Sequence, residues 1–66
     1  MNRAIDINGR AIQIGDLVHW YDPEGITSGN YEVYDIHSEE MVCLSDGYSE
    51  LEALPSECVV LRSKEK

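Results

Sequence analysis

Sixty-six residues form one domain at most, and a chain of this length buries only about 60% of the surface that its unfolded form exposes, which excludes a second core or a deep active-site cleft. The net charge is −8, and all five basic residues lie near the termini, outside the segment from Ala11 to Leu61. That segment holds every acid except Asp6 and Glu65. Its negative charge would repel phosphates over about 8–10 Å, so we expect no direct binding to nucleic acid.

The first element that we predict is a hairpin in the segment AIDINGRAIQI, residues 4–14. Asn8-Gly9 suits the two positive φ values that a type I′ turn requires. A two-residue loop gives two residue pairs, Ile7 with Arg10 and Ile5 with Ile12. One face then carries the apolar residues Ile5, Ile7, Ile12 and Ile14. The other face carries Asp6, Ala11 and Gln13.

A strand and a long loop are predicted next. LVHWYD, residues 17–22, is rich in β-branched and aromatic residues, which favour an extended strand. Val18 and Trp20 share one side of it, and the other side carries Leu17, His19 and Tyr21. DPEGITSGN, residues 22–30, contains Pro and Gly and has no periodicity, so we predict a loop.

Two further strands follow this loop. In YEVYDIHS, residues 31–38, the strongest apolar residues Val33 and Ile36 are three apart rather than two. We therefore expect a bulge between them that turns both inward. After a turn at SEE, MVCLSD forms a strand whose inward residues are Val42 and Leu44.

A second tight turn at the dipeptide DG, residues 46–47, leads into the return strand YSELEAL. PSE, residues 55–57, suits a 3₁₀ turn before the last strand, CVVLR. The sum is an all-β domain of five to six short antiparallel strands with one 3₁₀ turn near the C-terminus. We expect a closed or nearly closed small barrel, because closure removes exposed sheet edges. Residues 1–62 are assigned to this single domain and residues 63–66 to a polar tail.

The chain has two cysteines, Cys43 and Cys58. Its N-terminus lacks the apolar region of a signal peptide, and no stretch approaches the roughly 20 apolar residues of a membrane span. We therefore expect a cytoplasmic protein that has no membrane partner and keeps both thiols free. Each cysteine is then a half-buried, small hydrophobic residue. A disulfide between them and a metal or redox role are the alternatives.

The order of motifs from residue 12 to residue 61 resembles the SH3-like barrels and, within them, the Tudor domains. These motifs are IGDLVHW, an acidic Gly-containing loop, YEVYDI, EEMVCLSDGYSELEAL and PSEC. Tudor domains commonly show Gly-Asp before the first strand, an aromatic residue before an acidic loop, a tyrosine that opens the second strand, and a Gly-Tyr hairpin. The same pattern also describes KOW-like and other small bacterial barrels.

The resemblance implies an aromatic cage for a methylated lysine or arginine, which cation–π attraction would hold. The residues at the cage positions are Trp20, Tyr31 and Tyr48. The chain departs from the family where another aromatic residue and an asparagine are frequent, because these positions hold Ser45, Asp46 and Glu50. The implied cage is therefore incomplete.

The same aromatic residues suggest a binding surface without reference to the family. If Trp20, Tyr31 and Tyr48 converge, they form an apolar platform, and the acids at its border are Asp22, Glu24 and Glu50. Such a surface suits a cationic or proline-containing peptide. The alternative for Trp20 is a place inside the barrel. Tyr31 and Tyr48 adjoin turns and are expected to be at least half exposed, and Tyr21 and Tyr34 to keep their hydroxyls in water.

No motif links His19 or His37 to a nucleophile, and no spacing is typical of a metal site, so we expect no catalytic residue, no metal and no cofactor. The predicted function is a non-enzymatic interaction module that binds a protein or peptide as a monomer or weak homodimer. One alternative is an acidic decoy that occupies a nucleic-acid-binding protein by imitating phosphate charge. Another is an accessory subunit whose sheet edge pairs with a larger protein.

Overall fold

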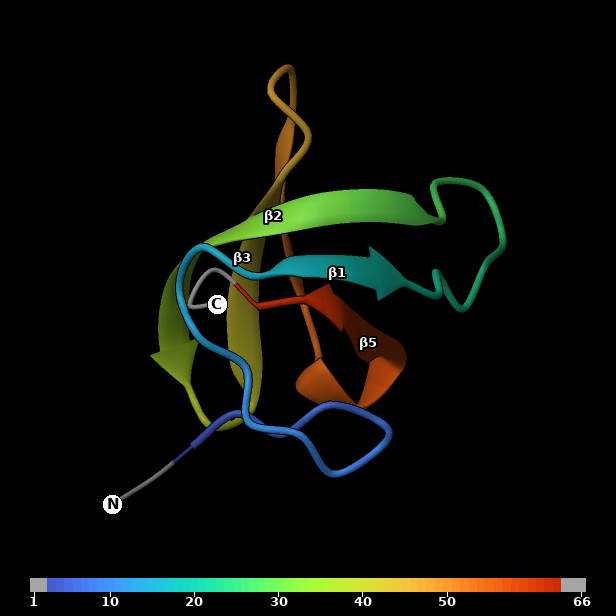
Figure 1. The fold of residues 1–66 in the computed structure, drawn as a ribbon. Coiled ribbons are helices and arrows are strands. Elements are labelled where there is room, and N and C mark those ends of the chain that lie inside the picture. The colour runs from blue at the N-terminus through green and yellow to red at the C-terminus, as the bar shows by residue number, and fades with distance from the viewer. Residues whose placement is uncertain (1–2, 64–66) are drawn as a thin grey trace.

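The computed structural model describes residues 3–63, and these residues form an all-β structure (Figure 1). Five strands lie in one antiparallel sheet: β1 (Leu17–Trp20), β2 (Gly29–Ser38), β3 (Met41–Ser45), β4 (Glu50–Ala53) and β5 (Cys58–Arg62). One 3₁₀ turn, Pro55–Glu57, joins β4 to β5. The predicted all-β class is confirmed, while most of the predicted polar tail falls in residues 64–66, outside the described part. No helix of the described residues is long and apolar enough to cross a membrane.

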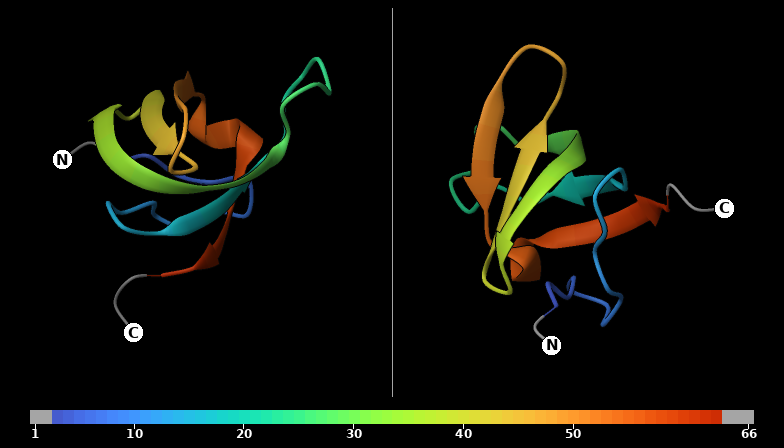
Figure 2. Two further views of the ribbon diagram at one scale, coloured as in Figure 1. Left: turned by 90° about the horizontal axis from the view of Figure 1, so that it is seen from above. Right: turned by 90° about the vertical axis from the view of Figure 1, so that its left-hand side faces the viewer.

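The sheet is strongly curved, and β2 takes part in two pairings (Figure 2). Its first residues pair with β1, where Tyr31 lies opposite Val18, and its later residues pair with β3, where Val33 lies opposite Leu44. The register shifts between Val33 and Asp35, so the predicted bulge is confirmed. The strand order β4-β3-β2-β1-β5 leaves two outer strands. The sheet formed by residues 3–63 is therefore open, and closure of the predicted barrel is not confirmed.

The centre of the core consists of aliphatic side chains from the first three strands. Val18, Val33, Val42 and Leu44 are fully buried. The predicted inward alternation of β1 and β3 is therefore confirmed. Full burial of each such side chain contributes about 1.5–3 kcal/mol. In a domain this small, these few side chains provide much of the free energy of folding.

The predicted hairpin in residues 4–14 has the wrong register. Ile5 lies opposite Ala11 rather than Ile12. In this turn only Gly9 has a positive φ, +86°, so the turn is not type I′. A shift of one residue moves Ile5 and Ile7 to the side of Ala11, opposite to Ile12. Ile5 and Ile7 are consequently exposed, and the buried residues are Ala4, Asp6 and Ile12. Ile14 is exposed as well.

The cause of this shift is the side chain of Asp6, which is only 4% exposed. Its Oδ1 accepts hydrogen bonds from the N–H groups of Asn8 at 2.9 Å and Arg10 at 2.8 Å. Its Oδ2 accepts a hydrogen bond from the N–H of Val60 in β5 at 2.8 Å. Hydrogen bonds to a carboxylate are about twice as strong as those between neutral groups. In the predicted register Asp6 would face outward and lose these bonds.

Candidate functional site

Trp20 and Tyr31, two of the three aromatic residues of the predicted platform, belong to the core. Their exposed fractions are 9% and 8%, and their rings meet edge to face with centroids 6.0 Å apart. The indole N–H of Trp20 donates to Oε1 of Glu57 at 3.0 Å, and the hydroxyl of Tyr31 donates to the carbonyl oxygen of Thr27 at 2.7 Å. The alternative that placed Trp20 inside the fold is confirmed. The expected exposure of Tyr31 is wrong, because its hydroxyl finds a loop partner while its ring stays buried.

Tyr48, the third aromatic residue, lies at the tip of the β3–β4 hairpin and is 97% exposed. Asp46 holds this tip, because its Oδ1 accepts hydrogen bonds from the N–H groups of Tyr48 at 2.8 Å and Ser49 at 2.7 Å. Gly47 adopts a φ of +93°, a conformation that favours glycine. The expected exposure of Tyr48 is confirmed. The predicted platform does not form, because the other two rings fill the core.

Asp22 organises the loop between β1 and β2. Its Oδ1 accepts a hydrogen bond from the N–H of Glu24, and its Oδ2 accepts three, from the N–H groups of Ile26 and Thr27 and from the Thr27 hydroxyl. Bonds from the backbone of Glu24 and Thr27 lower the pKa of Asp22 to about 2. The carboxylate of Asp22 is therefore occupied within its own loop, and Glu24 lies exposed beside it.

Several exposed acids gather instead on the outer side of β2, β3 and β4, away from the core. Two rows of side chains cross these strands: Glu32, Ser45 and Glu50 in one row, and Asp35, Cys43 and Glu52 in the next. The hydroxyl of Tyr34 donates to Oε1 of Glu50 at 3.5 Å, and Tyr34 is 43% exposed. We define the acidic face as the five residues Glu32, Tyr34, Asp35, Glu50 and Glu52.

Only Glu50 of the acidic face belongs to the site residues predicted from the sequence. Glu32 and Tyr34 were missed, although they alternate with the apolar residues Tyr31 and Val33 in the chain. A period of two places such alternating side chains on the outer side of a strand. The signal was therefore present, but it identifies a surface only when the neighbouring strands and their register are known.

Both thiols are free and buried. Cys58 lies in the core, where its Sγ donates to the carbonyl oxygen of Leu54 at 3.6 Å and burial raises its pKa to about 11. Burial, followed by the charges of Asp35 and Glu52, raises the pKa of Cys43. The prediction of free thiols is confirmed, and both stay protonated near neutral pH. Between residues 3 and 63, no group of three or more His, Cys, Asp or Glu side chains is arranged to hold a metal ion.

The outer edge of β5 is covered by the N-terminal segment. The N–H of Ile7 donates to the carbonyl oxygen of Cys58 at 2.9 Å, and the N–H of Val60 donates to Oδ2 of Asp6. The Nη1 of Arg10 donates to the carbonyl oxygen of Val60 at 3.2 Å. Burial raises the pKa of Asp6, but the backbone donors and the charge of Arg10 outweigh it, so the pKa lies below its usual value. Residues 6–10 thus replace a neighbouring strand.

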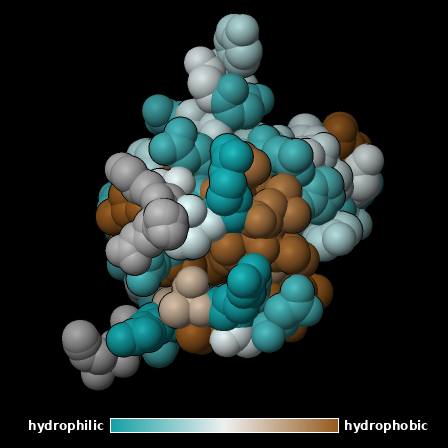
Figure 3. Space-filling view, in the orientation of Figure 1, coloured by the Kyte–Doolittle hydropathy of each residue, from teal (hydrophilic) through white to brown (hydrophobic). Residues whose placement is uncertain are grey.

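An apolar area lies on the face that carries β1 and β5 (Figure 3). Leu61 in β5 is 48% exposed, and Leu17 and Val59 on these strands are partly buried. The register between Leu17 and Val18 is irregular, and Leu61 has no partner residue in β1. This area adjoins the acidic face at one point, because Leu17 lies opposite Glu32.

The outer edge of β4 has a different structure. In the sheet of residues 3–63, β4 pairs with β3 alone. At the hairpin tip the N–H of Asp46 donates to the carbonyl oxygen of Ser49 at 3.2 Å. Because hydrogen-bonded pairs alternate in an antiparallel ladder, Leu51 then bonds to β3, and the backbone N–H and C=O groups of Glu50 and Glu52 point away from it. This edge therefore presents main-chain donors and acceptors to solvent.

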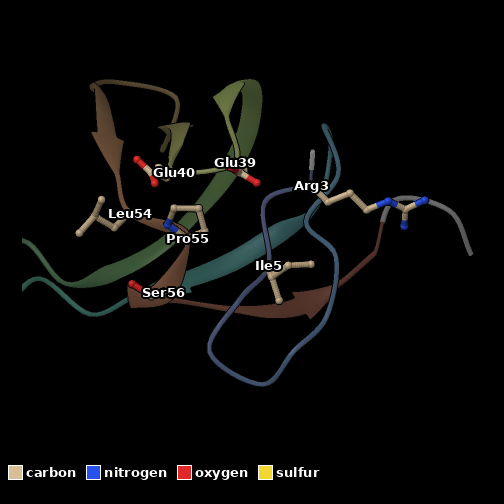
Figure 4. A pocket seen from close by; sticks show the side chains of 7 residues that line it. All are labelled: Arg3, Ile5, Glu39, Glu40, Leu54, Pro55 and Ser56. Carbon is tan, nitrogen blue, oxygen red and sulfur yellow. The ribbon is translucent and has the colours of Figure 1, made fainter. Parts of the chain in front are cut away.

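A hollow of about 330 Å³ lies beside the end of β4 (Figure 4). Leu54 and Pro55 line it from the β4–β5 connection, and Ile5 lines it from the N-terminal segment. Glu39 and Glu40 from the β2–β3 turn add two carboxylates. Leu54 is 45% exposed and Ile5 42% exposed, and Arg3 also lines the hollow, so it combines accessible apolar surface with charges of both signs.

No family model, curated protein or solved structure matches this chain. The resemblance to SH3-like barrels and Tudor domains therefore stays a prediction from sequence motifs. At the coarser level, the structure is an all-β sheet of five antiparallel strands with a 3₁₀ turn before the last strand.

Proposed function

We propose that this protein is a non-enzymatic, cytoplasmic interaction module that binds a cationic segment of a partner protein through the acidic face. One observation carries the proposal: a face with four carboxylates and a half-exposed tyrosine ring, in a stretch of chain that has no Lys or Arg. An SH3-like architecture is part of this proposal, and the number of strands and the position of the 3₁₀ turn support it. The two free thiols support a reducing compartment.

Repulsion within the acidic face favours a cationic partner. Glu32 and Glu50 flank Ser45 and stand two strand spacings apart, roughly 9–10 Å, which is comparable to the Debye length of about 8 Å at physiological salt. Salt ions therefore screen the repulsion between these two carboxylates only in part. A lysine or arginine side chain placed between them relieves this repulsion. Tyr34 adds a ring against which the cation can pack.

The strength of this attraction has an upper limit. Exposed charge pairs contribute about 0.2–1 kcal/mol each, so four carboxylates contribute at most about 4 kcal/mol. A free energy of that size corresponds to a dissociation constant of about 1 mM. Charge on the acidic face therefore selects the partner and orients it, and tighter binding needs additional contacts.

The proposed site keeps two of the residues expected from the sequence, Tyr48 and Glu50. Tyr48 stands at the hairpin tip beside β4 and is free to contact a bound segment. Trp20 and Tyr31 act instead inside the fold, where Trp20 bonds to Glu57 of the 3₁₀ turn and Tyr31 bonds to Thr27 of the β1–β2 loop. The proposed site also includes the other residues of the acidic face, which are Glu32, Tyr34, Asp35 and Glu52.

A lysine-rich peptide tests this proposal in a titration of isotope-labelled protein followed by amide chemical shifts. We expect the largest shifts in β2, β3 and β4. The triple variant Glu32→Gln, Glu50→Gln, Glu52→Gln should weaken binding about fivefold or more. The matched control Glu24→Gln, Glu39→Gln, Glu40→Gln removes the same charge elsewhere and should change binding less than about twofold. Equal weakening by both variants would show that net charge alone attracts the peptide.

The acidic decoy is the alternative that depends on the same carboxylates without the tyrosines. It predicts a nucleic-acid-binding protein as the partner and competition between this chain and DNA for that partner. It also predicts that Tyr48→Ala matters much less than the loss of the carboxylates. The exposed rings of Tyr34 in the acidic face and of Tyr48 at the nearby hairpin tip favour a peptide over a decoy role.

A further inference from the structure

The edge of β4 can supply the contacts that tighter binding of a partner requires in addition to charge. The N-terminal segment covers the edge of β5, whereas within residues 3–63 β4 has a single neighbour, β3. Glu50 and Glu52 direct both their side chains and their outward N–H and C=O groups to solvent in the same stretch. Charge and unpaired backbone groups therefore coincide at one strand.

We propose that the edge of β4 binds the partner by strand addition, and that the partner segment alternates Lys or Arg with apolar residues. This inference rests on the proposed function and specifies how the acidic face holds its partner. An added strand exchanges main-chain hydrogen bonds with Glu50 and Glu52, and its side chains alternate between the two sides of the sheet.

The alternating pattern follows from the two faces of β4. Partner residues directly opposite Glu50 and Glu52 share their side of the sheet, where opposite charges stabilise a cross-strand pair. The partner residue between them lies opposite Leu51, on the inner side. Leu51 packs against the core but is only partly buried, so an apolar partner side chain extends the core over it.

The length of the partner segment follows from what lies at the two ends of β4. The strand has four residues, and Tyr48 and Leu54 lie exposed just beyond its two ends. A segment of about five or six residues, roughly 17–20 Å long, would reach from the ring of Tyr48 to the hollow beside Leu54.

A second copy of this chain does not fit the same edge. Two β4 strands paired antiparallel about Leu51 would place Glu50 of each copy opposite Glu52 of the other, and like charges directly opposite are destabilising. The other outer strand, β5, already has Asp6 and Ile7 along its edge. Charge complementarity therefore selects a cationic segment of another protein.

The test uses the full chain and the capped peptide Lys-Val-Lys-Val-Lys. A permuted peptide, Lys-Lys-Lys-Val-Val, has the same charge but cannot place its cations on one face of a strand. Methyl groups on the lysine backbone nitrogens block the hydrogen bonds to β4, while methyl groups on the valine nitrogens point away from it. We expect the permuted and lysine-methylated peptides to bind about tenfold more weakly, and the valine-methylated peptide to bind within about twofold of the parent.

The amides of Glu50 and Glu52 provide the second readout. They should shift most on titration, and their hydrogen exchange should slow about tenfold when the peptide is bound. Equal binding of all four peptides, with shifts spread over the acidic face, would overturn strand addition and leave the proposed function standing. No binding by any of them would overturn both. A wild-type dimer whose protected amides are those of β4 would overturn the choice of partner.

Discussion

The two outer strands of this sheet differ in how their backbone groups are satisfied. Along β5, the Asp6 carboxylate and the backbone of Ile7 supply the hydrogen bonds that a sixth strand would otherwise supply. Along β4, the only protection among the described residues is the charge of Glu50 and Glu52. Charged side chains on an edge discourage pairing with neutral or acidic strands. The edge of β5 is therefore covered at Cys58 and Val60, whereas the edge of β4 is guarded by charge alone among the described residues.

Among substitutions at the two edges, removal of the Asp6 carboxylate should lower the free energy of unfolding most. Asp6→Ala leaves the N–H groups of Asn8, Arg10 and Val60 without their acceptor, and we expect a loss of about 2–4 kcal/mol in the free energy of unfolding. Urea denaturation measures it. Asp46→Ala, which removes an exposed carboxylate from the hairpin tip, is the control and should cost less. A loss below about 0.5 kcal/mol for Asp6→Ala would refute the role assigned to this side chain.

Acid should weaken the same edge without a mutation. The pKa of Asp6 is lowered in the folded protein, so its stabilisation is present above the unfolded value of about 3.9 and is lost as the pH falls through the folded value. Asp22 and Asp46, whose pKa values are also lowered, add to the slope. Urea denaturation between pH 6 and pH 2 should show falling stability below about pH 4. The difference between wild type and Asp6→Ala should shrink over the same interval. A constant difference would contradict this assignment.

Arg10→Met tests the weaker contact of the covered edge. The substitution keeps much of the aliphatic side chain and removes the hydrogen bond from Nη1 to the carbonyl oxygen of Val60. We expect a loss of about 0.5–1.5 kcal/mol in thermal or urea unfolding. Arg62→Met removes the same charge from β5 and serves as the control. If both variants lose the same stability, the effect comes from charge and not from the bond to Val60.

Substitutions at the edge of β4 should change the stability of the protein least and its self-association most. Glu50→Thr with Glu52→Thr should change the free energy of unfolding by no more than about 0.5 kcal/mol per site, because both residues are exposed. Loss of the charges should raise the average mass seen in sedimentation at the same protein concentration. The control pair Glu24→Thr and Glu39→Thr, away from β4, should sediment like the wild type. An unchanged mass for the β4 variant would argue against charge as the guard of this edge.

Local patterns in the sequence predicted most of the strands and their inward residues. Alternation identified Val18 and Trp20 in β1 and Val42 and Leu44 in β3, and the irregular spacing in β2 predicted the bulge. These predictions are confirmed because the period of a strand depends only on the backbone of that strand. The 3₁₀ turn was also predicted from local sequence, because a proline and its two neighbours are sufficient to indicate it.

The predictions that were wrong concern polar groups with distant partners. The turn at Asn8-Gly9 was expected to be a two-residue type I′ turn, but the register differs by one residue and Asp6 bonds to Val60, which is 54 residues away in the chain. Tyr31 was expected at the surface because it follows a loop, but its hydroxyl bonds inside that loop and its ring reaches the core. Each error moved a site residue or a face to the other side of the sheet.

For this protein, residue order alone established the acidic middle of the chain and predicted its all-β class and its free thiols. Which acids lie side by side depended on the pairing of β2 with β3 and of β3 with β4, and which strand edge is covered depended on where the Asp6 carboxylate finds its donors. The reason is physical. Alternation is a property of one strand, whereas a surface or an edge exists only when strands far apart in the chain meet in a defined register.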